Sequence, residues 1–276
     1  MPISLERKWY DYQMQLHYEI SGSGTDLVLL SGVGGSTRYW AHLVAGFESS
    51  GYRVIRIDML GFGRSPRLHH GQYDLKAHTK AVVATCNTIG VKNAVIVGFS
   101  MSCSAALHVA ASAPEYCERI VLLCPAFYSS SHKAVEMTSH SETLPRWLLE
   151  SRYAPLLCKI ICNNKYIAIP VYRTLGKNLP LDVRDDARLH HWKSYRESFT
   201  HLTIDYRATT DLVTAQCPVQ VVYGLHDRYL ETTFIQSWPK LNPNIDLECI
   251  PEGRHQLPHQ KPDIVLASII RSKLVT

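Results

Sequence analysis

Short runs of β-branched and aliphatic residues recur along the chain, and most of them end in a glycine or a polar residue. Such runs predict strands of a parallel sheet that is buried on both faces. The predicted strands cover residues 26–32, 53–58, 93–98, 119–124, 219–224 and 245–250. Stretches with helical spacing separate most of them, as in residues 75–90, where Ala77, Ala81, Val82 and Cys86 recur on one face. The alternation predicts an α/β fold with helices on both faces of a mainly parallel sheet.

One long segment breaks this alternation. Residues 127–200 contain no convincing strand, and prolines, aromatic residues and charges punctuate helix-like pieces. We interpret the segment as a helical insertion above the edge of the sheet where such folds bind ligands. The predicted division is therefore a core of residues 1–126 and 201–276 and a helical cap, or lid, of residues 127–200.

Composition and charge favour a globular protein and argue against nucleic-acid binding. The 276 residues are 46% hydrophobic and 19% charged, which is ordinary for a large globular domain. The formal charge of +5 is modest, and no basic run with interleaved aromatic residues suggests nucleic-acid binding. No window approaches the roughly 18 uncharged apolar residues of a membrane span, and the first residues lack the apolar region of a signal peptide. We expect a cytoplasmic protein without a membrane span.

The eight cysteines are scattered, and most lie inside apolar runs, where free cysteine behaves as a small hydrophobic residue. This usage fits a reducing compartment. Cys158 and Cys162 are spaced for one face of a helix, but no second pair accompanies them. We therefore interpret both as packing residues and expect neither a metal nor an organic cofactor.

A serine in the stretch VIVGFSMSCSAALHVA, residues 95–110, is the strongest candidate for chemistry. Ser100 follows a predicted buried strand and precedes a predicted helix. The small residues Gly98 and Ser102 permit a sharp turn that holds Ser100 at the carboxyl edge of the sheet. The amino terminus of the helix then offers N–H groups to a developing negative charge. The alternative is a serine that caps an ordinary helix.

Two glycine-containing loops follow the first two predicted strands. In SGVGGSTRYW, residues 31–40, the glycines let the backbone N–H of Val33 turn toward Ser100 and pair with the N–H of Met101 as an oxyanion hole. A phosphate cradle is the alternative, but the lysine and the spacing of a P-loop are missing. The second loop, DMLGFGRSP, is predicted to be structural, with Asp58 bonded to nearby backbone or to Arg64.

Two late strands are followed by YGLHD and by PEGRHQLPHQKP, which supply Asp227 and His255. A serine hydroxyl is a weak nucleophile, so it needs a base within hydrogen-bond reach and a third group that orients the base. We predict Ser100 as nucleophile, His255 as base and Asp227 as orienting acid. The competing histidines are His190, His191, His226 and His259. Among these candidates, only His255 lies in the loop immediately after the last predicted strand.

These motifs, in this order, resemble the α/β-hydrolase superfamily over nearly the whole chain. The resemblance implies a mainly parallel sheet of about eight strands, a helical cap, and acyl transfer to water through a serine ester intermediate. Two positions depart from the family pattern. Ser31 stands where the family usually has histidine, and its hydroxyl can replace only part of that loop's hydrogen bonding. Ser102 stands where the family elbow usually ends in glycine. Plant receptors for strigolactones and karrikins also have serine at this position.

The expected function is that of a serine hydrolase acting on an ester or thioester of a small to medium hydrophobic acyl group. A lactone or C–C bond hydrolase, and a hormone-like receptor with slow or single turnover, are the alternatives. Residues 128–200 hold 11 Lys and Arg against 7 Asp and Glu. This excess can attract an anionic substrate or an acidic acyl-carrier protein, or it is simply a solvated helical surface.

Overall fold

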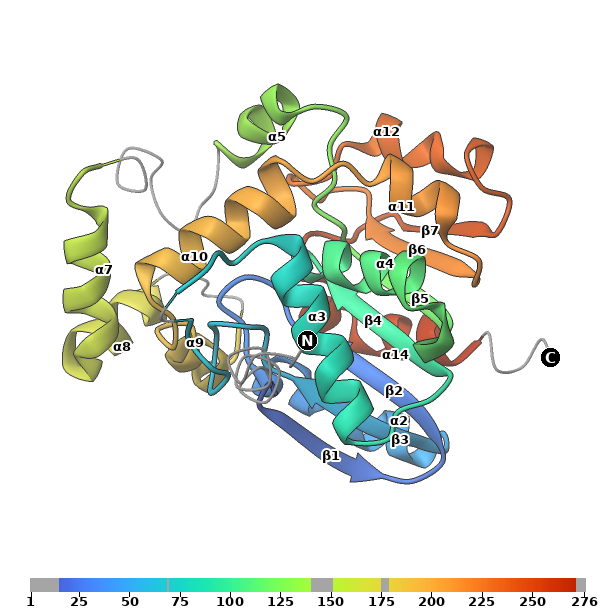
Figure 1. Cartoon of the computed structure of the whole chain (residues 1–276), viewed down its shortest axis with the longest axis horizontal. Helices are drawn as coiled ribbons and strands as arrows, with labels where there is room; N and C mark the ends of the chain where they lie inside the picture. Colours follow the sequence, from blue (N-terminus) through green and yellow to red (C-terminus); the bar gives the residue numbers. More distant parts are fainter. Residues whose placement is uncertain (1–14, 69, 140–150, 175–178, 272–276) are drawn as a thin grey trace, which may run out of the picture.

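The computed structural model describes residues 15–68, 70–139, 151–174 and 179–271. A seven-stranded sheet with the order β1-β3-β2-β4-β5-β6-β7 lies at the centre of this part of the chain (Figure 1). The strands are β1 (Tyr18–Gly22), β2 (Thr25–Leu30), β3 (Tyr52–Ile57), β4 (Ala94–Phe99), β5 (Cys117–Leu123), β6 (Val219–Gly224) and β7 (Ile245–Ile250). β1 pairs antiparallel with β3, and all other pairs of these strands are parallel. The predicted mainly parallel sheet is confirmed.

β1 is the strand that the sequence pattern did not predict. It lies at the edge of the sheet and pairs Tyr18 with Ile57 of β3. Its five residues are only partly buried or exposed, and Ile20 is 41% exposed. An edge strand with little burial has no need of the continuous apolar run that marked the six other strands.

Successive residues of the central strands pack into two different hydrophobic clusters. Leu27 and Leu29 pack with Phe47 of helix α2 (Val44–Ser49) and Val265 of α14 (Pro262–Arg271). The alternate residues of β2 instead face α3 (Leu75–Thr88) and α4 (Ser102–Ser112). The sheet is therefore covered by helices on both faces, as predicted.

The described part of residues 127–200, here called the helical segment, is helical and contains no strand. Its helices are α5 (Ser131–Thr138), α7 (Ala154–Asn163), α8 (Lys165–Thr174), α9 (Leu181–Asp186) and α10 (Trp192–Phe199). α10 continues directly into a π-helical turn, Thr200–Ile204, so no break in the backbone marks residue 200. Part of the predicted cap, residues 140–150 and 175–178, lies outside the described residues. The division into core and cap stays a prediction.

Shorter helices complete the described chain. They are the 3-10 turns Thr37–Leu43, Pro114–Tyr116 and Trp238–Lys240, with α11 (Thr209–Thr214), α12 (Thr232–Gln236) and α13 (Leu257–Gln260). None of the helices within the described ranges has the length and apolar character needed to cross a bilayer.

Candidate active site

Ser100 lies in the sharp turn between β4 and α4. Its φ is +55°, a left-handed backbone conformation that typically costs a non-glycine residue about 1–3 kcal/mol. The turn brings strand and helix so close that a Cβ on Gly98 would approach the Cα of Cys103 to 2.7 Å. The N–H of Ser100 donates to the carbonyl of Leu123 in β5, at 3.0 Å. Glycine at position 98 and the contact with β5 together hold the serine above the carboxyl edge of the sheet.

Ser102 ties this turn to the neighbouring strand. Its Oγ is fully buried, accepts the N–H of Phe99 at 2.9 Å, and lies 2.9 Å from the carbonyl oxygen of Leu30 at the end of β2. The sequence predicted only that a small residue would be tolerated here. The structure gives the hydroxyl a stabilising role that glycine cannot supply.

Ser100, His255 and Asp227 form one continuous chain of hydrogen bonds. Nε2 of His255 lies 2.9 Å from Oγ of Ser100, and Nδ1 lies 2.8 Å from Oδ2 of Asp227. The side chain of Asp227 is 1% exposed and that of His255 is 17% exposed. Oδ1 of Asp227 accepts the N–H of Tyr229 at 2.8 Å, which fixes the rotation of the carboxylate. The predicted nucleophile, base and orienting acid are thus within the reach that proton transfer requires.

Asp227 and His255 come from loops that follow adjacent parallel strands, β6 and β7. The two loops touch through backbone: a Cβ on Gly224 would lie 2.2 Å from the carbonyl carbon of Gly253, and the N–H of His226 donates to the oxygen of Gly253 at 2.9 Å. The rings of Tyr229 and Phe99 flank the His255 imidazole, with centroids 4.6 and 5.3 Å away. Sheet order and close loop packing therefore position both side chains.

The competing histidines have other contacts. His259 stacks on His42 at a centroid distance of 4.2 Å, and His191 caps the amino terminus of α10. His226 is exposed to solvent, and His190 contacts Cys162 in the helical segment. The structure brings His255, and none of these four, to a hydrogen bond with Ser100.

Val33 and Met101 line the same cavity as Ser100. Within the described residues, neither backbone N–H has a protein acceptor. The glycine loop comes close to the serine, since a Cβ on Gly32 would lie 3.2 Å from the Cβ of Ser100. Both N–H groups are therefore available for an oxyanion, and that role stays a prediction. Ser31 differs from expectation, because its buried hydroxyl has no hydrogen-bond partner in the described chain and so does not support the loop.

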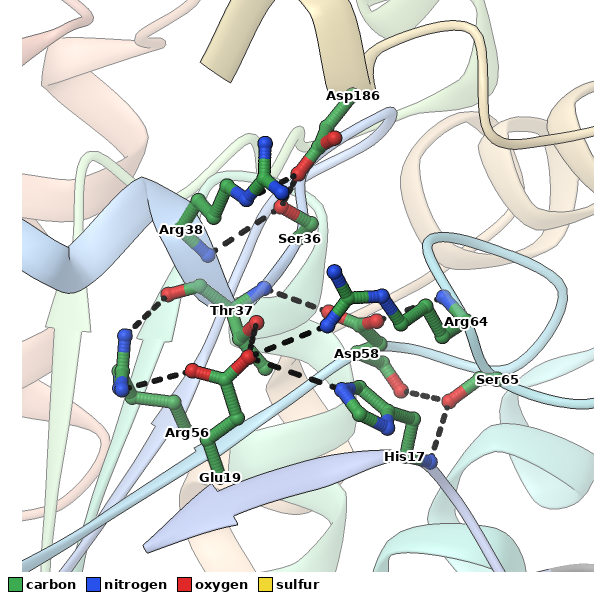
Figure 2. A network of polar contacts seen from close by, with 10 residues as sticks. All are labelled: His17, Glu19, Ser36, Thr37, Arg38, Arg56, Asp58, Arg64, Ser65 and Asp186. Carbon is green, nitrogen blue, oxygen red and sulfur yellow. Dashed lines mark hydrogen bonds and ion pairs between the residues drawn. The ribbon is translucent and has the colours of Figure 1, made fainter. Parts of the chain in front are cut away.

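A polar network anchors the far end of the glycine loop (Figure 2). Oδ1 of Asp58 accepts the N–H of Thr37 at 2.6 Å, and Oδ2 accepts the N–H of Arg64 at 2.7 Å. Burial raises the pKa of the Asp58 carboxyl, and these hydrogen bonds oppose the rise. Oγ of Ser36 donates to Asp186 of α9 at 2.7 Å, which links the loop to the helical segment. The predicted structural contacts of Asp58 are confirmed.

A cavity of about 400 Å³ opens above Ser100, between the glycine loop and the helical segment. Its apolar lining includes Tyr128, Leu179, Val183, Trp192, Tyr195 and Phe199. Arg184 and Arg196 also line it, and none of its described lining residues is an aspartate or glutamate. The sequence predicted an apolar pocket and a positive helical segment, but it could not show which cations face the cavity.

Comparisons with known proteins agree with this architecture. A family model described as "alpha/beta hydrolase fold" matches residues 26–156. The crystal structure of E-2-(acetamidomethylene)succinate hydrolase superposes with a TM-score of 0.74 over 93% of this chain and 94% of that chain, at 16% identity. The chain therefore has the α/β-hydrolase fold. The resemblance read from the motifs is confirmed at this level.

Further known proteins are similar to part or most of the chain. The enol-lactonase from Burkholderia xenovorans has a TM-score of 0.70 at 20% identity, covering 93% of this chain and 95% of that chain. A 2-hydroxy-6-oxononadienedioate/2-hydroxy-6-oxononatrienedioate hydrolase of Burkholderia vietnamiensis is 36% identical over 117 residues. That match spans 40% of this chain and 40% of the relative.

Proposed function

We propose that the protein is a serine hydrolase that cleaves an ester or thioester of a small to medium hydrophobic acyl group. The observation that carries the proposal is the hydrogen-bonded chain of Ser100, His255 and Asp227 at the base of an apolar cavity. Nucleophile, base and orienting acid in mutual contact are the arrangement that activates a serine hydroxyl near neutral pH.

The roles follow from the geometry. As Oγ of Ser100 attacks the substrate carbonyl, Nε2 of His255 takes its proton, and Asp227 stabilises the imidazolium. The N–H groups of Val33 and Met101 donate to the oxyanion, and one such donor contributes about 10²- to 10³-fold in rate. His255 then protonates the leaving group. Water, activated by the same imidazole, cleaves the acyl-serine and restores the free enzyme.

A series of p-nitrophenyl esters from acetate to decanoate tests the acyl preference by stopped-flow. We expect sustained turnover with an optimum inside the series, because the cavity has aromatic walls and a finite volume of about 400 Å³. A burst of about one product per chain followed by silence would contradict the hydrolase and favour the hormone-like receptor with single turnover. Absence of both burst and turnover across the series would contradict the acyl-serine mechanism for these esters.

A second candidate is hydrolysis of a C–C bond or a lactone in a substrate that carries a carboxylate. Support comes from the relatives, one of which is by its name a 2-hydroxy-6-oxononadienedioate hydrolase and another an enol-lactonase. It also comes from Arg184 and Arg196, which give the described cavity lining a positive charge without an acidic residue. The same charge is compatible with an anionic acyl group or an acidic acyl-carrier protein as partner.

Arg196→Gln measures how much this charge contributes. We expect kcat/KM for a p-nitrophenyl hemisuccinate ester to fall about fivefold, because an exposed ion pair contributes up to about 1 kcal/mol. The uncharged butyrate ester of similar length should keep its wild-type kcat/KM. Lys193→Gln on the same helix is the matched control, since Lys193 does not line the cavity. An equal loss for both esters, or no loss for either, would show that Arg196 does not select for charge.

A further inference from the structure

Two cysteines and a histidine meet in the helical segment, beside the cavity. Cys158 and Cys162 lie one turn apart on α7, and His190 comes from the turn between α9 and α10. The two Sγ atoms are 3.6 Å apart, and Sγ of Cys162 is 3.7 Å from Nε2 of His190. All three atoms lie within 4.8 Å of one another. Cys162 and His190 are 5% and 6% exposed, and Cys158 is half-buried.

We propose that Cys158, Cys162 and His190 bind a Zn²⁺ ion. In a tetrahedral zinc site, bonds of about 2.3 Å to sulfur and 2.0–2.1 Å to nitrogen place two sulfurs about 3.8 Å apart and a sulfur and a nitrogen about 3.6 Å apart. The observed separations of 3.6 and 3.7 Å are close to these edges. Thiolate and imidazole ligands also favour zinc over the hard cations magnesium and calcium. Water completes the fourth position.

The imidazole of His190 is already oriented as a ligand. Its Nδ1 lies 2.7 Å from the carbonyl oxygen of Ala187, so the Nδ1–H donates to that oxygen and the lone pair of Nε2 is directed toward Cys162. The ring packs on Tyr195 and Phe62, with centroids 5.2 and 6.3 Å away. A backbone carbonyl that fixes the tautomer, together with packing that fixes the ring, is the usual support of a metal-bound histidine.

Zinc binds the thiolate form of cysteine and not the thiol. An incoming Zn²⁺ therefore releases the protons of both thiols to solvent as two Zn–S bonds and one Zn–N bond form. The two thiolates then balance the charge of the ion.

The bound ion would connect elements that form part of the cavity. His190 and Ala187 line the cavity, and α7 packs against α8 and α10 at one end of the molecule (Figure 1). An ion that joins α7 to residue 190 stabilises the folded helical segment, since it binds the assembled site and not the unfolded chain. This inference concerns metal binding and holds whether or not the chain hydrolyses esters.

The sequence alone argued against a metal, because a pair of cysteines without a second pair is weak evidence for zinc. The third ligand is 28 residues further along the chain than Cys162. Only folding brings His190 close to Cys158 and Cys162. From the sequence, His190 was a candidate only for the base that activates Ser100.

Titration of the full-length chain with Zn²⁺ against a chromophoric chelator tests the proposal. The chain is first stripped of metal and kept reduced with a phosphine, so that neither a disulfide nor a thiol reductant competes. We expect one Zn²⁺ per chain, and we expect Co²⁺ in its place to give the near-ultraviolet absorption of a thiolate-to-cobalt bond. No stoichiometric uptake, or uptake of Cu⁺ without Zn²⁺, would overturn the assignment.

Variants identify the ligands. Cys158→Ser and His190→Gln should each weaken Zn²⁺ binding at least about 100-fold, because even loss of an outer support of a ligand costs about 10- to 100-fold. Cys249→Ser, at an exposed cysteine, is the matched control and should bind as the wild type does. Cys158 is only half-buried, so its substitution leaves the fold testable by circular dichroism. Zinc binding that survives both ligand variants, or that is lost equally in Cys249→Ser, would overturn the proposal.

Discussion

Ser100→Ala is expected to lower kcat for the best ester substrate by about 10⁵- to 10⁶-fold, which is the scale of removing the nucleophile from a serine triad. The substitution removes only Oγ, whose contact in the described chain is Nε2 of His255. Alanine and serine both carry a Cβ, so the strain at φ +55° is the same in both chains. Folding should therefore be unchanged while acyl-serine formation is lost. Steady-state kinetics together with thermal unfolding of the same preparation measure both effects.

A matched control lies one turn away. Ser104 is also fully buried on α4, but its Oγ donates to the carbonyl of Met101 at 2.8 Å and has no contact with His255. Ser104→Ala should retain activity within about tenfold, because it removes a single hydrogen bond worth about 1 kcal/mol. If Ser100→Ala kept the activity of Ser104→Ala, Ser100 would not be the nucleophile. A burst that persisted in Ser100→Ala would lead to the same conclusion.

Most of the strands that were predicted correctly are buried on both faces, and only β7 among them lies at an edge of the described sheet. In β4 all six residues are buried, and such a run has no solvent-facing position to interrupt it. β1 was missed because its faces are partly exposed. Polar residues such as Glu19 and Ser21 are therefore tolerated in it, and they interrupt the apolar run. An apolar run therefore predicts the buried central strands better than the partly exposed edge strand β1.

The positions of the candidate active-site residues could be predicted because each follows a strand. Parallel strands end at one edge of the sheet, so Ser100, Asp227 and His255 had to approach one another once strand order placed β4, β6 and β7 in one sheet. Contacts across the helical segment could not be predicted in this way. The approach of His190 to Cys162, and of Asp186 to Ser36, depends on how short helices pack, and helical spacing carries no information about that packing.

Asp227→Asn is expected to lower kcat about 10⁴-fold, the scale known for this change in a serine triad, with KM changing much less. The reason lies in the second oxygen of the carboxylate. Oδ1 of Asp227 accepts the N–H of Tyr229 at 2.8 Å, and an asparagine can satisfy that donor only with its carbonyl oxygen. Its NH₂ group then faces Nδ1 of His255, where Oδ2 of the aspartate accepts the hydrogen bond of the Nδ1–H. The imidazole is forced to carry its proton on Nε2, so it can no longer take the proton of Ser100.

The control for this change is Asp246→Asn on the exposed side of β7, which should leave kcat at the wild-type value. A loss in Asp227→Asn that appears in kcat while thermal unfolding stays unchanged supports the tautomer argument. A loss of stability in parallel with activity would instead make Asp227 a buried structural group whose charge the fold requires. Activity within about tenfold of wild type would contradict the role altogether, because the neutral amide cannot stabilise the imidazolium that forms when Ser100 attacks.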